Sequence, residues 1–91
     1  MDHIKVIFRK YDDEIIAFFP EMHVNFGKIL TYQHIGQHCE ADVRFYYDTK
    51  KANEAEYTPL LNELKQIYDD CILDVKFKIR SDDLRYKAWK I

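Results

Sequence analysis

Alternating apolar and polar residues at the start of the chain predict two β-strands. In the segment Ile4–Lys10, the side chains of Ile4, Val6 and Phe8 fall on one face. The segment Glu14–Pro20 is instead apolar on both faces, a pattern that indicates a central strand covered from both sides.

Turn residues around the second segment predict its ends. Asp12 and Asp13 lie between the two strands, and residues of this type favour a tight turn, so the pair should form a hairpin. Pro20 should end the second strand, because proline has no N–H to donate to a sheet. Residues 21–27 should then form a loop, with Asn25 and Gly27 as breakers.

The middle of the chain predicts two further strands. The segment Lys28–His34 is the third candidate, and Asp42–Asp48 is the fourth. In the fourth, apolar and polar positions alternate, with Val43, Phe45 and Tyr47 set against Arg44 and Tyr46.

Residues 53–70 predict the main helix. Asn53 is a good N-cap, and Glu56 completes the pattern of a capping box. One apolar stripe at helical spacing should face a core: Tyr57, Leu60, Leu61, Leu64 and Ile67. Pro59 lies past the first turn, where it should bend the helix; the alternative is a later start at Pro59, capped by Thr58.

The C-terminal part predicts a fifth strand and a short helix. In the segment Cys71–Arg80, one face is apolar (Leu73, Val75, Phe77 and Ile79) and the other is polar (Asp74, Lys76, Lys78 and Arg80). The segment Ser81–Ile91 begins with a cap and two acids and ends with bases, which favours a helix; a strand that extends the sheet is the alternative. So short a helix must dock, through Leu84, Ala88 and Ile91, on its own domain or on a second copy of the chain.

These elements predict an α+β fold. A mostly antiparallel sheet of four to five strands should pack one face against the main helix. Residues 1–80 should form a single domain, and residues 81–91 a C-terminal extension.

Composition supports a folded domain that carries little net charge. The 91 residues are 47% hydrophobic and 15% aromatic, with two Gly and two Pro, so the chain is neither a linker nor a disordered tail. The formal net charge of −2 gives no overall basic field for nucleic acid and no polybasic membrane patch. The first ten residues lack the apolar core of a signal peptide, so we expect a cytoplasmic protein with Cys39 and Cys71 as free thiols.

The stretch "YQHIGQHCEAD", Tyr32–Asp42, holds two of the four histidines and is the main candidate site. His34 and His38 do not suffice for a metal centre, because metal sites need three or four ligands and no second ligand pair occurs. Gly36 favours a turn. The neighbouring polar side chains could hydrogen-bond to the free backbone groups of this turn. A binding role is the alternative for these residues: Tyr32, His34, Gln37, His38 and Asp42.

Catalysis has little support in the sequence. There is no serine elbow, phosphate loop or zinc-protease motif. Cys39 and His38 are adjacent, so on a strand they would point to opposite faces and not form a nucleophile–base pair. We therefore expect no cofactor and no catalytic residue, and keep a metal- or thiol-dependent enzyme around His34, Cys39 and Asp42 as the third reading.

The chain resembles a family of short, uncharacterised bacterial and phage proteins. The similarity runs from Lys5 to Lys78 and centres on the pattern YxHxGQHxxAD, with further matches in "FPE" at 19–21 and "EYxPL" at 56–60. The motif positions are Tyr32, His34, Gly36, Gln37, His38, Ala41 and Asp42. The resemblance implies a phage or mobile-element context, but it does not assign an activity. Cys39 stands where the family commonly has Gly, and residues 81–91 extend beyond its usual end.

A basic segment near the C-terminus gives an alternative function. Lysine and arginine residues interleaved with Tyr86 and Trp89 are typical of surfaces that stack nucleotides. The candidate nucleic-acid surface comprises Lys76, Lys78, Arg80, Arg85, Lys87 and Lys90. The favoured function is nevertheless a small, non-catalytic binding protein of phage or mobile-element type that contacts a host or phage protein, with nucleic-acid binding as the alternative. The sequence leaves the oligomeric state open between a monomer and a homo-oligomer, and membrane binding is not expected.

Overall fold

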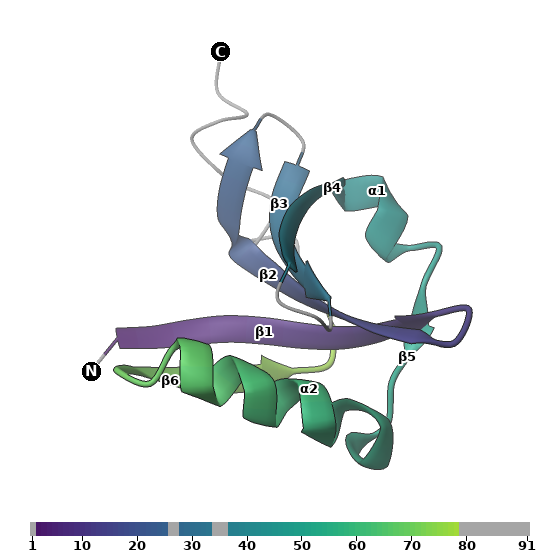
Figure 1. Cartoon of the computed structure of the whole chain (residues 1–91). Coiled ribbons are helices and arrows are strands. Elements are labelled where there is room, and N and C mark those ends of the chain that lie inside the picture. The colour runs from purple at the N-terminus through teal and green to yellow at the C-terminus, as the bar shows by residue number, and fades with distance from the viewer. Residues whose placement is uncertain (1, 26–27, 34–36, 79–91) are drawn as a thin grey trace.

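The computed structural model describes residues 2–25, 28–33 and 37–78. Two helices and six strands occur in this part of the chain, and Figure 1 shows their arrangement. In chain order they are β1 (Asp2–Tyr11), β2 (Glu14–Asn25), β3 (Lys28–Gln33), β4 (Gln37–Asp42), α1 (Val43–Tyr46), β5 (Lys50–Lys51), α2 (Glu54–Ile67) and β6 (Cys71–Lys76).

The strands form one sheet in the order β4-β3-β2-β1-β5, with β6 also paired to β1. Every pair is antiparallel except β1 with β6, which is parallel. In the chain, α2 lies between β5 and β6. Figure 1 shows α2 lying along β1 and β6. The prediction of a mostly antiparallel sheet packed against one main helix is therefore confirmed.

The β1–β2 hairpin turns at the two predicted aspartates. Tyr11 pairs with Glu14, so Asp12 and Asp13 alone form the connection. Asp12 has a φ of 53°, a left-handed conformation that the short side chain of Asp tolerates better than most residues do.

The central strand β2 separates two apolar clusters, as its two-sided pattern predicted. Ala17 and Phe19 face α2, whereas Ile16 and Phe18 face α1. The first cluster also holds Val6, Phe8, Tyr32, Ala52, Tyr57, Leu60 and Leu64. The second also holds Ile7, Ile29 and Tyr46. The sheet is thus covered on both faces over its central strands.

The prediction that Pro20 ends the second strand was wrong. β2 continues to Asn25, and its pairing with β3 jumps from Phe19 opposite Leu30 to His23 opposite Ile29. Pro20 lies in this irregularity, and the pairing of β2 with β1 stops before it, at Phe18. A bulge leaves backbone groups unpaired, so a residue without an N–H fits there.

The predicted fourth strand was also wrong. The fourth strand is Gln37–Asp42, and the next residues, Val43–Tyr46, form the short helix α1. Tyr46, which the predicted alternation placed on the same side as Arg44, is buried, whereas Tyr47 is 62% exposed. The Arg9 guanidinium lies 4.6 Å from the centre of the Tyr46 ring and donates to the Thr49 carbonyl, which holds α1 against the sheet.

The main helix begins where predicted. The Asn53 side chain accepts from the Glu56 N–H at 2.8 Å, and the Glu56 carboxylate accepts from the Asn53 N–H at 3.0 Å. Pro59 lies inside the helix, so the later start at Pro59 was wrong. Thr58 instead donates its hydroxyl to the Glu54 carbonyl at 2.6 Å.

The apolar faces of α2 and β6 are shorter than predicted. Tyr57, Leu60 and Leu64 are buried, but Ile67 is 45% exposed. Leu73 and Val75 pack on the α2-side cluster as expected. β6 ends at Lys76, and Phe77 is 55% exposed, so its inward orientation was wrong.

The predicted C-terminal helix lies outside the described residues, as do Ile79 and Arg80. It stays a prediction, together with the boundary between residues 1–80 and 81–91. In the part of the chain that the structure describes, no helix is long and apolar enough to cross a membrane.

Candidate functional site

The stretch Tyr32–Asp42 forms a β3–β4 hairpin followed by the start of α1. Tyr32 and His38 lie directly opposite each other in the ladder between these strands. His34 and Gly36 lie outside the described residues, and so does the side chain of Gln37. Of the predicted site residues, the structure therefore brings Tyr32 and His38 together, and it places Asp42 at the far end of β4.

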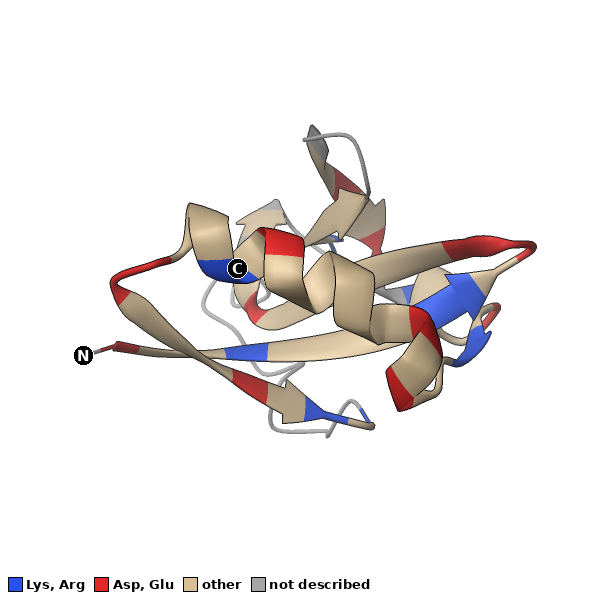
Figure 2. Ribbon diagram, turned by 60° about the horizontal axis from the view of Figure 1, so that its bottom comes forward, with Lys and Arg blue, Asp and Glu red and all other residues tan. Residues whose placement is uncertain are grey.

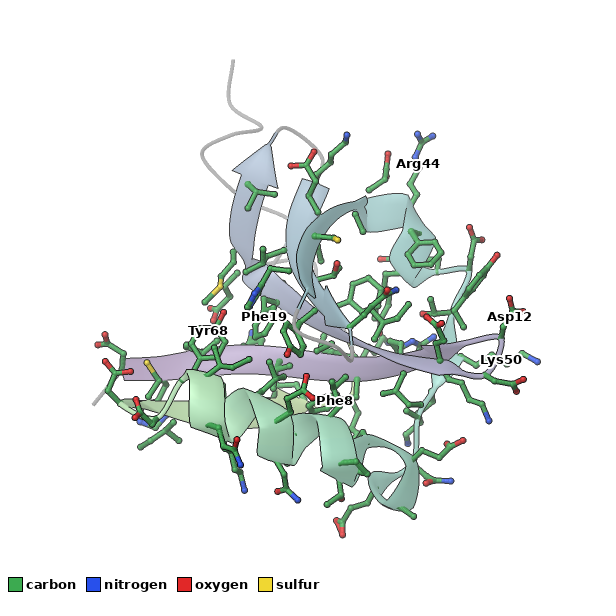
Figure 3. The ribbon with its side chains drawn as sticks, viewed as in Figure 1. Phe8, Asp12, Phe19, Arg44, Lys50 and Tyr68 are labelled. Carbon is green, nitrogen blue, oxygen red and sulfur yellow. The ribbon has the colours of Figure 1, made fainter. Side chains whose placement is uncertain are left out.

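His38 is the centre of an aromatic cluster at the C-terminal end of α2. Its Nε2 lies 2.8 Å from the hydroxyl oxygen of Tyr68, and its ring is 4.7 Å from that of Tyr32, measured between centroids. The Phe19 and Tyr68 rings are 5.8 Å apart, and Figure 3 shows these two side chains side by side above β1. The hydrogen bond joins β4 to the end of α2.

Tyr32 makes a second connection to the same helix. Its ring is buried, and its hydroxyl donates to the Glu63 carboxylate. We call Phe19, Tyr32, His38, Glu63 and Tyr68 the His38 cluster. Burial raises the pKa of the Tyr68 phenol, which therefore stays protonated at neutral pH and is available as a hydrogen-bond donor.

Asp42 has a separate role at the start of α1. Its carboxylate accepts from the Arg44 N–H at 2.8 Å and from the Arg44 guanidinium at 3.3 Å. These hydrogen bonds to Arg44 hold the pKa of Asp42 below its usual value. Asp42 is thus the N-cap of a helix, the kind of local backbone bonding that the sequence suggested for the corner.

The cysteines are placed poorly for nucleophilic catalysis. Cys39 and Cys71 are free thiols. Cys39 follows His38 on β4, so the two side chains project from opposite faces of the sheet. Burial, and next the hydrogen bond to Asp70, raise the pKa of the Cys71 thiol, which favours the less reactive protonated form.

No metal-binding group is found within residues 2–25, 28–33 and 37–78: nowhere in these ranges do three His, Cys, Asp or Glu side chains gather closely enough to hold an ion. An open pocket lies instead at the tip of the β1–β2 hairpin. Its lining has balanced charge and comprises Lys10, Tyr11, Asp12, Asp13, Asp48, Lys50 and Lys51. Asp12 and Lys50 are labelled at this end of the molecule in Figure 3.

The predicted basic surface is described only in part. Lys76 and Lys78 are exposed, whereas Arg80, Arg85, Lys87 and Lys90 lie outside the described residues. The structure adds two lysines that the sequence analysis missed, because Lys50 and Lys51 form β5 beside the same strand that pairs with β6. Their only signal was a pair of bases just before the helix cap.

The outer edge of β4 is the other accessible feature of the site. β4 ends the strand order, and its outer edge has no partner strand in the described part of the chain. The side chains of His38, Cys39 and Glu40 are exposed along it. Backbone groups at such an edge are ready to pair with another extended segment.

Comparison of the chain with protein-family models, with curated proteins and with solved structures finds no match. The resemblance to short bacterial and phage proteins therefore stays a prediction from the motif. The function rests on the geometry described above.

Proposed function

We propose that the protein is a small binding protein whose β4 edge captures an extended segment of a partner protein. The observation that carries this proposal is the open outer edge of β4, Gln37–Asp42, at the end of the sheet. Six residues are as long as an average strand, which suits the addition of one peptide strand.

The position of β4 suits recognition as well as pairing. One face of the strand carries His38, which is held by Tyr68, and the opposite face carries Cys39 and Ala41. An added strand would therefore place alternate side chains against the His38 cluster and against the α1 side. Main-chain hydrogen bonds supply affinity in this mode, and the alternate side chains supply specificity.

The resemblance of the YxHxGQHxxAD motif supports a partner from a phage or its bacterial host. Tyr32 and His38 of this motif build the cluster beside the edge. The motif would then preserve the shape of the binding strand rather than a catalytic group.

The test is affinity capture from a bacterial host with a matched pair of variants. Glu40→Pro removes one backbone N–H from β4, and Glu40→Ala removes the same side chain but keeps that N–H. We expect the wild type and Glu40→Ala to retain one specific partner, identified by mass, and Glu40→Pro to lose it. Equal capture by both variants would contradict the edge as the binding element.

A second measurement separates lost binding from lost folding. Hydrogen exchange of the wild type should show slower exchange of β4 amides when the captured partner is added, because those amides become paired. Protection confined to other strands would overturn the proposal, whatever the stability of Glu40→Pro.

A further inference from the structure

Unpaired positive charge gathers at the sheet edge opposite β4. Lys10 and Lys28 each have a carboxylate oxygen within 3.4 Å. By contrast, four exposed lysines form no hydrogen bond or ion pair with another described residue, and they lie on or just after the two strands that share the outer edge of β1. They are Lys50, Lys51, Lys76 and Lys78.

The strand register places these lysines next to one another. Lys76 of β6 lies opposite Ile7, and Lys51 of β5 lies opposite Arg9. These positions are two residues apart along β1, which corresponds to roughly 7 Å. Directly paired residues share a face of the sheet, so both lysines project on the face opposite α2, where Ile7 packs.

An exposed aromatic ring lies between the two strand ends. Phe77 follows β6 directly and is 55% exposed. The Lys51 ammonium is 5.3 Å from the centre of its ring, a cation–π contact that holds the two side chains together. A ring flanked by lysines combines the two groups that bind a nucleotide, one for the base and one for the phosphate.

We propose that this basic edge, defined as Lys50, Lys51, Lys76, Phe77 and Lys78, binds single-stranded nucleic acid. The lysines would contact backbone phosphates, and a base would stack on the Phe77 ring. Bases of a duplex are already stacked on each other, so the ring selects a single strand. The site is independent of the β4 edge, which lies at the other end of the strand order.

Charge on the neighbouring elements sets the path of the bound nucleic acid. Asp12, Asp13 and Asp48 line the pocket beside Lys50 and Lys51, and Figure 2 shows acidic residues at the hairpin and basic residues at the end of β6. A phosphate chain is repelled by the hairpin. It should therefore run from Lys51 across Phe77 towards Lys78. The chain as a whole has a net charge of −2, so the attraction is local and should be sensitive to salt.

The first test measures binding of a labelled oligothymidine of about 16 nucleotides by fluorescence anisotropy over a series of salt concentrations. Lys51→Ala and Lys76→Ala should each weaken binding and reduce the slope of log affinity against log salt by about 0.7. Lys65→Ala is the matched control, since Lys65 is an exposed lysine on α2 and away from the basic edge. Equal effects of all three variants, or no binding by the wild type at low salt, would overturn the proposal.

The second test separates base stacking from plain attraction to anions. Phe77→Ala should weaken oligothymidine binding about tenfold and leave the salt slope unchanged, because stacking involves no counterion release. A duplex of the same length should bind more weakly than the single strand. If Phe77→Ala binds like the wild type and heparin competes as well as the oligonucleotide, the edge is a general anion surface and the proposal is wrong.

Discussion

His38 shows how one side chain can connect three separate parts of the chain. Its imidazole lies on an edge strand, meets the ring of the buried Tyr32 on the neighbouring strand edge-on, and hydrogen-bonds to Tyr68 at the end of α2. The side chain itself remains exposed. It is therefore a structural contact that is also accessible to a ligand.

His38→Ala should lower the free energy of unfolding by about 1 kcal/mol, because it removes one hydrogen bond and an aromatic contact. Thermal or urea unfolding measures this change. Cys39→Ala is the control, since Cys39 is exposed on the opposite face of the same strand, and it should change stability by less than about 0.5 kcal/mol. Purified protein that contains stoichiometric zinc, lost in His38→Ala, would refute the structural role.

Glu56 should make stability depend on pH on the acid side. The Asn53 N–H and, to a smaller extent, Lys10 hold the pKa of Glu56 below its usual value of 4.5. The folded state therefore favours the carboxylate, which stabilises the fold above pH 4.5 and ceases to do so as the pH falls through the lowered pKa. The melting temperature of the wild type should exceed that of Glu56→Gln at neutral pH, and the difference should vanish in acid.

Lys10→Met distinguishes the two causes of this effect. It removes the ion pair of 2.7 Å but leaves the capping box intact. Because the backbone bond is the larger cause, Lys10→Met should retain most of the acid dependence. Melting curves of Glu56→Gln that run parallel to those of the wild type at every pH would contradict the assignment.

At the scale of elements, the short helix α1 shows where a sequence pattern fails. The residues from Val43 to Tyr47 alternate apolar and polar side chains and have high β-propensity, so a strand was the natural prediction. A helix of four residues is too short for a helical period to appear. Its one local signal was Asp42 as N-cap, and its stability comes from the packing of Tyr46 on β2 and Arg9.

Two neighbouring tyrosines test that assignment. Tyr46→Ala should cost about 3–5 kcal/mol, because it empties a buried aromatic site. Tyr47→Ala should cost less than about 0.5 kcal/mol, because its side chain is mostly in solvent. Chemical denaturation of the two variants measures the difference. A larger loss of stability in Tyr47→Ala than in Tyr46→Ala would instead agree with the strand predicted from the sequence.

Pro59 makes α2 less stable than the same helix would be with another residue at this position. Inside the helix it removes one backbone hydrogen bond and crowds the preceding turn. Pro59→Ala should stabilise the protein by about 2 kcal/mol, the helix penalty of proline less the entropy that the unfolded chain regains. Asn62→Ala, an exposed change on the same helix, should give less than about 0.7 kcal/mol. If the two variants have equal unfolding midpoints, the proline is without cost in this position.

Two further features, the length of β2 and the place of β5, could not be predicted because they depend on long-range pairing. The two strands of the first hairpin, the third strand and the capped helix followed from local patterns of turn, period and cap, and the structure contains them. Pro20 stays within β2 because β3 changes its register there. Lys50 and Lys51 belong to the basic edge because they form the two-residue strand β5, which pairs with β1. Neither pairing leaves a periodic signal in the chain.

For the whole molecule, the two-sided cover of β2 predicts an uneven stability. β2 has neighbours on both sides and a cluster on each face, whereas β4 and β5 lie at the ends of the strand order. In hydrogen exchange followed by NMR, the paired amides of β1 and β2 should be protected longest, and those of β5 should exchange first. Uniform exchange across all strands would contradict the layered core.

The parallel pairing of β1 with β6 also gives the domain a mechanical property. Six residue pairs join the two strands, from Asp2 with Cys71 to Ile7 with Lys76. A force applied at Asp2 and Lys76 pulls these strands past each other along their length, so all of the hydrogen bonds between them bear the load together. A force applied at Asp2 and Cys71 would instead part them one bond at a time. Linked into a chain of proteins through the first pair of positions, the domain should resist stretching much better than through the second.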